Sequence, residues 1–66
     1  MTAYWTGFDG TVFHADTPAE MLRTAPLTAH EDAAVLVDEH PRGTDWLFTG
    51  TLNTVAAEWG RRLAAK

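Results

Sequence analysis

The feature that most constrains the fold is a helix start that follows directly on a predicted hairpin. Asp16-Thr17-Pro18-Ala19-Glu20 supplies a capping threonine, a proline suited to the first helical position and a glutamate three residues after the cap. Pro26 ends the pattern, since the residue before a proline is biased away from helical geometry. We therefore predict a short helix over residues 18–25, with a buried face formed by Met21, Leu22 and Ala25. A helix of about two turns is stable only when it docks onto other structure.

The residues before this helix predict a β-hairpin. Asp9-Gly10 separates two apolar runs, and this dipeptide between apolar runs is a strong hairpin signal. The strands are expected at residues 3–8 and 11–15. Gly10 supplies the positive φ that such turns require, and Gly7 weakens the first strand or marks a bulge.

The middle of the chain allows two interpretations. Val35-Leu36-Val37 and Trp46-Leu47-Phe48 are rich in residues that favour strands, and His40-Pro41-Arg42-Gly43 between them is typical of a turn. These segments predict a second hairpin. The alternative is a helix over residues 29–39, because Thr28-Ala29-His30-Glu31 is another possible capping box.

The last segment predicts a longer amphipathic helix over residues 52–64, with Thr51 as its cap. Its apolar positions recur every three or four residues and define the expected buried stripe, Leu52, Val55, Ala56, Trp59 and Leu63. On the other face, Glu58 and Arg62 are spaced to form an ion pair.

These elements predict one small α+β domain over residues 1–66, in the order ββαββα, with a four-stranded, largely antiparallel sheet packed by two helices. The two halves of the sequence resemble each other at an offset of 34 residues, since Thr17 and Met21 correspond to Thr51 and Val55. Large apolar residues occupy successive strand positions, as in Tyr4-Trp5. The strands therefore look apolar on both faces, and we expect one face to be covered by a partner or by another copy of the chain.

Composition argues against the common enzyme classes. The chain contains neither serine nor cysteine, and its glycines do not have the spacing of a nucleotide-binding loop. His14-Ala15-Asp16 and Asp38-Glu39-His40 place imidazoles near carboxylates, but neither segment is a recognised motif, and a metal or proton-transfer site would need two of His14, His30 and His40 to converge. We expect no catalytic residues, no metal and no cofactor.

The function favoured by the sequence is a non-catalytic module for protein–protein interaction or regulation: an inhibitor, an antitoxin-like regulator or an accessory subunit. The hairpin followed by a capped helix is similar in plan to small antitoxins whose sheet and helix cover a toxin, a resemblance of architecture alone. The anchors would be exposed aromatic residues of a sheet face, surrounded by a polar rim. The candidates are Tyr4, Trp5, Phe8 and Trp46. The alternative interpretation places the first three of these aromatic residues in the core.

Nucleic-acid binding is the second hypothesis, and it would use Arg42, Arg61 and Arg62. The charge balance disfavours it, because the formal net charge is −4 and residues 1–40 contain seven acids against one arginine. The partner is therefore expected to be another protein or a second copy of the chain, and nucleic acid is less favoured. With no long apolar run and no basic residues before an apolar stretch at the start, we expect a cytoplasmic protein without a membrane span.

Overall fold

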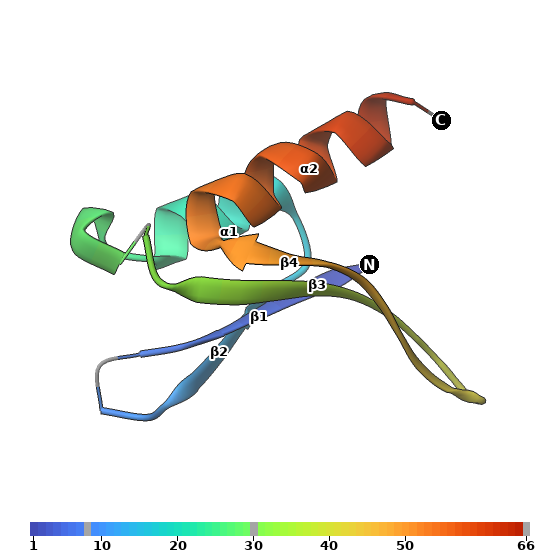
Figure 1. Cartoon of the computed structure of the whole chain (residues 1–66), viewed down its shortest axis with the longest axis horizontal. Coiled ribbons are helices and arrows are strands. Elements are labelled where there is room, and N and C mark those ends of the chain that lie inside the picture. Colours follow the sequence, from blue (N-terminus) through green and yellow to red (C-terminus); the bar gives the residue numbers. More distant parts are fainter. Residues whose placement is uncertain (8, 30, 66) are drawn as a thin grey trace.

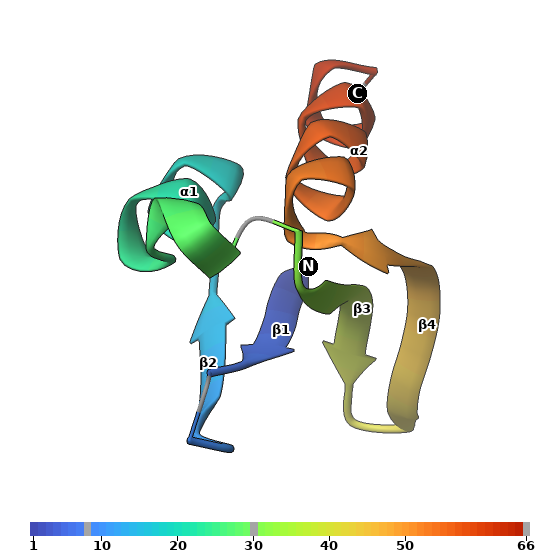
Figure 2. The same cartoon turned by 60° about the vertical axis from the view of Figure 1, so that its left-hand side comes forward.

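The computed structural model describes residues 1–7, 9–29 and 31–65, and it has the expected ββαββα order (Figure 1). A single antiparallel sheet has the strand order β2-β1-β3-β4, and both helices lie on one side of it (Figure 2). The predicted α+β class is confirmed. The elements are β1 (Thr2–Thr6), β2 (Val12–Ala15), α1 (Pro18–Thr24), a 3-10 turn η1 (Leu27–Ala29), β3 (Ala33–His40), β4 (Gly43–Thr51) and α2 (Leu52–Ala64).

The first hairpin forms where the sequence predicts it, with shorter strands. β1 ends at Thr6, and Gly10 closes the turn with a φ of 87°, the positive value expected of it. Gly7 follows β1 directly and leaves room for the ring of Phe13, because a Cβ at Gly7 would lie 2.5 Å from Phe13 Cε2. The end of the strand predicted over residues 3–8 falls on Phe8, which lies outside the described residues.

Helix α1 begins at its predicted cap. The hydroxyl of Thr17 accepts a hydrogen bond of 3.1 Å from the backbone N–H of Glu20. Met21 and Ala25 are buried one turn apart, but the prediction that Leu22 is buried is wrong, since its exposed fraction is 42%. A helix of seven residues turns only a narrow stripe toward the sheet, and Leu22 is rotated about 100° away from Met21.

The second hairpin is also confirmed, and the alternative helix over residues 29–39 is wrong. Ala33–His40 forms β3, which pairs with β1 on one side and β4 on the other. The β-branched residues at positions 35 and 37 suit this central strand, and pairing on both edges outweighs the helical spacing of the alanines. Gly43 ends the turn with a φ of 136°.

Helix α2 follows β4 without a loop, because the last strand residue, Thr51, is also its cap and accepts from the N–H of Thr54 at 3.2 Å. The predicted ion pair is present, with Arg62 Nε 2.9 Å from Glu58 Oε2. The first four residues of the predicted stripe are buried, but Leu63 is 45% exposed. The last turn of α2 rises away from the sheet (Figure 1), so the expectation that Leu63 is buried is wrong.

The hydrophobic core lies between the sheet and the helix layer. α1 contacts β2, α2 contacts β3 and β4, and the two helices contact each other. Trp5 stacks on Phe13 with ring centroids 5.9 Å apart. Each half of the chain thus forms a hairpin and a capped helix, and β1 and β3 join the halves at the centre of the sheet. The largest fully buried side chains are Trp59, Met21, Leu36, Leu52 and Val55.

Candidate protein-interaction surface

The sheet has a second face that neither helix covers (Figure 1). Because successive strand residues point to opposite faces, the register of the four strands fixes which residues lie on this side. Residues such as Ala3 and Leu36 pack under the helices, so their neighbours in each strand point the other way. We call this second side the open face. It comprises Thr2, Tyr4, Thr6, Val12, His14, Ala33, Val35, Val37, Glu39, Thr44, Trp46, Thr49 and Thr51.

A β-bulge decides which residues of β4 reach the open face. Leu36 pairs with Phe48 and Val37 pairs with Trp46, so Leu47 has no partner in the register. Leu47 and Phe48 are half-buried and both pack against the core, whereas Trp46 points to the opposite side. The bulge thus explains how three consecutive large apolar residues fit into one strand.

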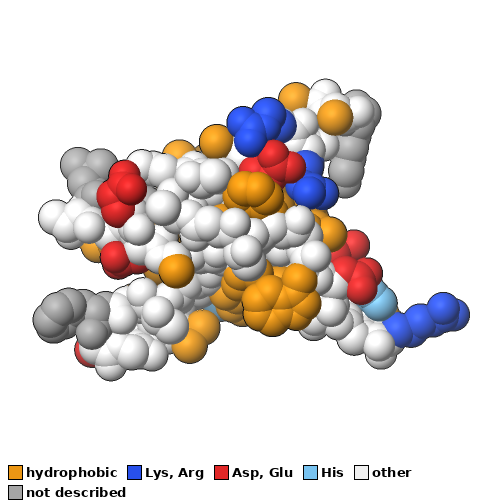
Figure 3. All heavy atoms as spheres, viewed as in Figure 1, with side chains coloured by type: hydrophobic (Ala, Val, Ile, Leu, Met, Phe, Trp, Pro, Cys, Tyr) orange, Lys and Arg blue, Asp and Glu red, His pale blue; other side chains and the backbone are white. Residues whose placement is uncertain are grey.

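Trp46 is the most exposed large apolar residue of the described chain, at 71%. It lies opposite Val37, which is only 3% exposed although it belongs to the open face and not to the core cluster. Val37 is flanked by Thr2 on one side and Trp46 on the other. In the space-filling view, apolar side chains reach the surface on the sheet side of the molecule and also beside the basic groups of the helix layer (Figure 3).

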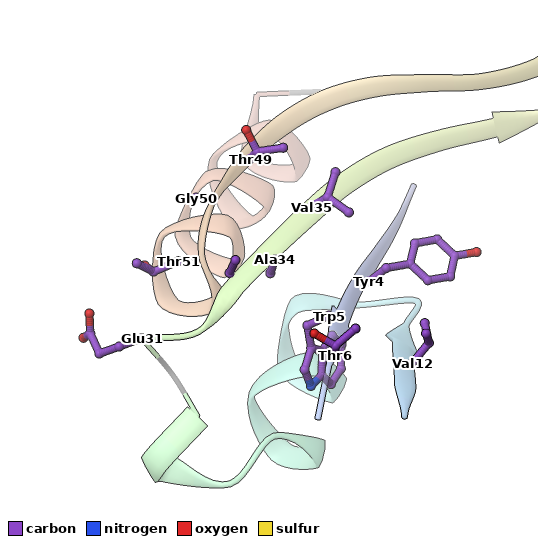
Figure 4. Close-up of a pocket in the computed structure, with 11 residues that line it drawn as sticks. Tyr4, Trp5, Thr6, Val12, Glu31, Ala34, Val35, Thr49, Gly50 and Thr51 are labelled. Carbon is purple, nitrogen blue, oxygen red and sulfur yellow. The ribbon is translucent and has the colours of Figure 1, made fainter. Parts of the chain in front are cut away.

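A shallow hollow of about 670 Å³ lies on the open face (Figure 4), bordered by Thr49, the next open-face residue after Trp46 in β4. Side chains from all four strands line it, with Tyr4 and Val12 from the first hairpin and Val35 and Thr49 from the second. Glu31 lies at one end. Sequence reasoning missed Val12, Val35 and Thr49, although the alternation of residues 12 and 14 and of residues 35 and 37 marks one side of each strand.

Few charges lie on the open face. Among the described residues, the carboxylate of Glu39 lies within its rows and accepts a hydrogen bond from the hydroxyl of Tyr4, and the carboxylate of Glu31 lies at its edge, at one end of the hollow. This bond, together with partial desolvation and the negative charges of Glu39 and Asp16, raises the pKa of Tyr4 above its ordinary value of 10.0. The ring of His14 lies 6.0 Å from that of Tyr4, measured between centroids. An apolar and threonine-rich surface with so little charge resembles the core of a protein–protein interface more than an ordinary solvated sheet face.

The structure separates the aromatic residues predicted as anchors. Tyr4 and Trp46 lie on the open face, but Trp5 points under the helices and is 4% exposed. The prediction of Trp5 as a surface anchor is therefore wrong, and the competing interpretation as a core residue holds for this side chain. Phe8 lies outside the described residues.

The three arginines predicted for nucleic-acid binding do not share one element. Arg42 lies in the turn at the far tip of the β3–β4 hairpin (Figure 1). Arg61 and Arg62 lie on α2, and both bond to the carboxylate of Glu58 at 2.9 Å. These bonds hold the pKa of Glu58 below its ordinary value of 4.5, the bond from Arg61 having the largest effect.

The histidines are also dispersed. His14 is part of the open face, and His40 Nε2 lies 3.1 Å from Asp45 Oδ2 at the end of the second hairpin. His30 lies outside the described residues. Within residues 1–7, 9–29 and 31–65, no group of three or more histidine and carboxylate side chains is arranged to hold a metal ion.

The fold and the open face define a small α+β protein with a two-layer core and one uncovered sheet surface. No family model, curated protein or solved structure matches the chain. Among the helices described, none is both long enough and apolar enough to cross a membrane.

Proposed function

We propose that this chain is a small non-catalytic protein-binding module and that the open face is its binding surface. The observation that carries the proposal is the position of Trp46, a tryptophan that projects from a sheet face beside an apolar hollow. Tryptophan is among the residues most enriched at the energetic centres of protein interfaces. An inhibitor, an antitoxin-like regulator and an accessory subunit each fit this class.

The depletion of charge supports the same function. A solvated sheet face usually alternates apolar residues in the core with polar and charged residues outside. Here the outer residues are mainly threonine and valine, with Tyr4 and Trp46 on neighbouring rows of the sheet. Threonine contributes a hydroxyl that can bond to a partner without the cost of desolvating an ion.

Nucleic-acid binding is less well supported. Phosphate contacts require arginines that are free to reach the backbone of the nucleic acid. Arg61 and Arg62 already bond to Glu58, and Arg42 lies on a different element. We therefore do not propose it. The expected cytoplasmic location belongs to the present proposal, and localising a tagged chain in the cells that produce it is the test.

Site-specific photo-crosslinking in those cells tests the binding surface. A photoreactive amino acid replaces Thr49 on the open face in one variant and Leu63 on α2 in the control variant. The expected result is a protein adduct from position 49 that is lost when Trp46→Thr is added, and no such adduct from position 63. Equal adducts from both positions, or none from position 49, would contradict the proposal.

A further inference from the structure

We propose that the open face is covered by a second copy of this chain, in a two-fold dimer in which Trp46 of each copy enters the hollow of the other. This inference rests on the proposed function, because it names the partner of the same surface. Its first support is geometric. Trp46 does not line the hollow of its own chain, although both features belong to the same face.

A projecting side chain and a hollow on the same face can fit together when two copies of that face are related by two-fold symmetry. In a two-fold contact both copies use the same patch. If one residue of the first copy contacts a different residue of the second copy, the same contact therefore also forms with the two copies exchanged. Trp46 lies three and five residues before Thr49 and Thr51, which border the hollow on the same strand. Because the bulge adds one residue to β4, this spacing matches the two and four residues from Val37 to Val35 and Ala33 on β3, or about 7–14 Å along the strand. A two-fold axis between the two features therefore brings each indole over the partner's hollow.

The hollow is large enough for this insertion. Its volume of about 670 Å³ exceeds what one indole ring requires, and its walls are apolar or uncharged except for Glu31 at one end. Val12 and Val35 supply the aliphatic walls of the hollow, and the ring of Tyr4 supplies an aromatic surface for the indole of Trp46 from the other copy. Aromatic pairs in such offset or edge-to-face contacts add to the effect of area burial.

Charge favours a like partner over a strongly charged one. The chain has a formal net charge of −4, but of its acids only Glu39 lies within the rows of the open face, where it bonds to Tyr4, and Glu31 lies at one end of the hollow. Two copies can therefore bring this face together without placing rows of like charges against each other.

The available area predicts a weak dimer. β3 and β4 each present four side chains on the open face, β1 presents three and β2 presents two. At about 4.8 Å between strands and about 6.8 Å between side chains on one face, these positions give a footprint of about 420 Å² for each copy. Two copies then bury about 850 Å² in total, which is in the range of weak, transient interfaces. We therefore expect dissociation in the micromolar range.

Association is measured by analytical ultracentrifugation from about 1 to 500 μM, which brackets micromolar dissociation. The wild-type chain is expected to pass from monomer to dimer, Trp46→Thr is expected to remain a monomer, and Leu63→Ala on the exposed face of α2 is expected to behave as wild type. Circular dichroism confirms that each variant is folded. Val12→Glu, which places a charge in the hollow, is a second variant expected to remain monomeric.

Thiol labelling locates the interface, because the chain has no cysteine of its own. In a Thr49→Cys variant, alkylation is expected to slow as the dimer forms, in proportion to the dimerised fraction. In a Leu63→Cys variant, the rate is expected to be the same at all concentrations. Adding Trp46→Thr restores fast labelling at position 49.

The outcomes separate this inference from the proposed function. A chain that stays monomeric at 500 μM, or a dimer that Trp46→Thr leaves unchanged, overturns the second-copy proposal. If photo-crosslinking from position 49 still yields an adduct with a different protein, the protein-binding function stands with another partner. A monomer that also gives no adduct from position 49 overturns both.

Discussion

The guanidinium of Arg62 donates a hydrogen bond of 3.3 Å to the backbone carbonyl of Leu47, and so joins α2 to the bulge of β4. The same side chain bonds to Glu58 within the helix. Arg62 therefore links the helix layer to the position where the strand changes its pairing. Its neighbour Arg61 bonds to the same glutamate, but no hydrogen bond joins its side chain to the described residues of the sheet.

The two arginines should accordingly differ in their contributions to stability. Arg62→Ala is expected to lower the free energy of unfolding by about 1–2 kcal/mol, because it removes a part-buried bond to a carbonyl as well as an ion pair. Arg61→Ala removes an exposed pair and is expected to cost less than about 0.5 kcal/mol. Urea denaturation of both variants measures the difference. Equal losses would show that the bond to Leu47 contributes nothing.

Met21 and Leu22 test the orientation of α1. Met21 is fully buried, so Met21→Ala is expected to cost about 2–5 kcal/mol through lost packing and a cavity. Leu22 faces solvent, and Leu22→Ala is expected to change stability by no more than about 0.5 kcal/mol. Thermal denaturation ranks the two variants. A large loss for Leu22→Ala would mean that the helix presents a different face to the sheet.

Tyr4 is the only tyrosine of the chain, so its ionisation can be followed by ultraviolet absorbance without interference from another phenol. The bond to Glu39 stabilises the neutral phenol, and the titration midpoint is expected above 10.0. The folded-state pKa is raised, so the stabilisation is complete below pH 10 and is lost as the pH rises through the folded-state pKa. Glu39→Gln is expected to lower the midpoint. A midpoint unchanged by this substitution would exclude the carboxylate as its cause.

Two glycines should respond to alanine in opposite ways. Gly60 lies within α2 and has open space where a Cβ would project, so Gly60→Ala is expected to raise stability by about 1 kcal/mol through better helix propensity. Gly7→Ala is expected to lower stability, because the ring of Phe13 occupies the space of the new methyl group. Thermal melts of the two variants give the comparison. A gain from Gly7→Ala would mean that the ring moves aside without cost.

The local signals in the sequence were sufficient for the order of the elements. Thr17 and Thr51 cap helices, and Gly10 takes a positive φ, because these effects act between residues close in the chain. The exposure of Leu22 and Leu63 was not predictable in the same way. Periodicity identifies the apolar side of a helix but does not indicate which of its turns lie against the sheet.

The open face depends on contacts that are remote in sequence. Tyr4 on β1 pairs with Val35 on β3, and no short sequence motif predicts this pairing. The bulge at Leu47 likewise has no sequence mark, since a regular strand would also accept Trp46-Leu47-Phe48. The sequence could therefore predict that the strands were apolar on both sides, but not that Trp46 alone of these three would point away from the core.

The bulge also bears on how copies of this protein can accumulate. An edge strand with regular, unpaired backbone groups can add further strands without limit, which is the geometry of a fibril. In β4 the bulge interrupts that regularity, and the carbonyl of Leu47 is bonded by Arg62. The opposite edge is formed by β2, which has only four residues. Both borders of the sheet are thus poor templates for open-ended growth, whereas contact through a face is complete once that face is covered.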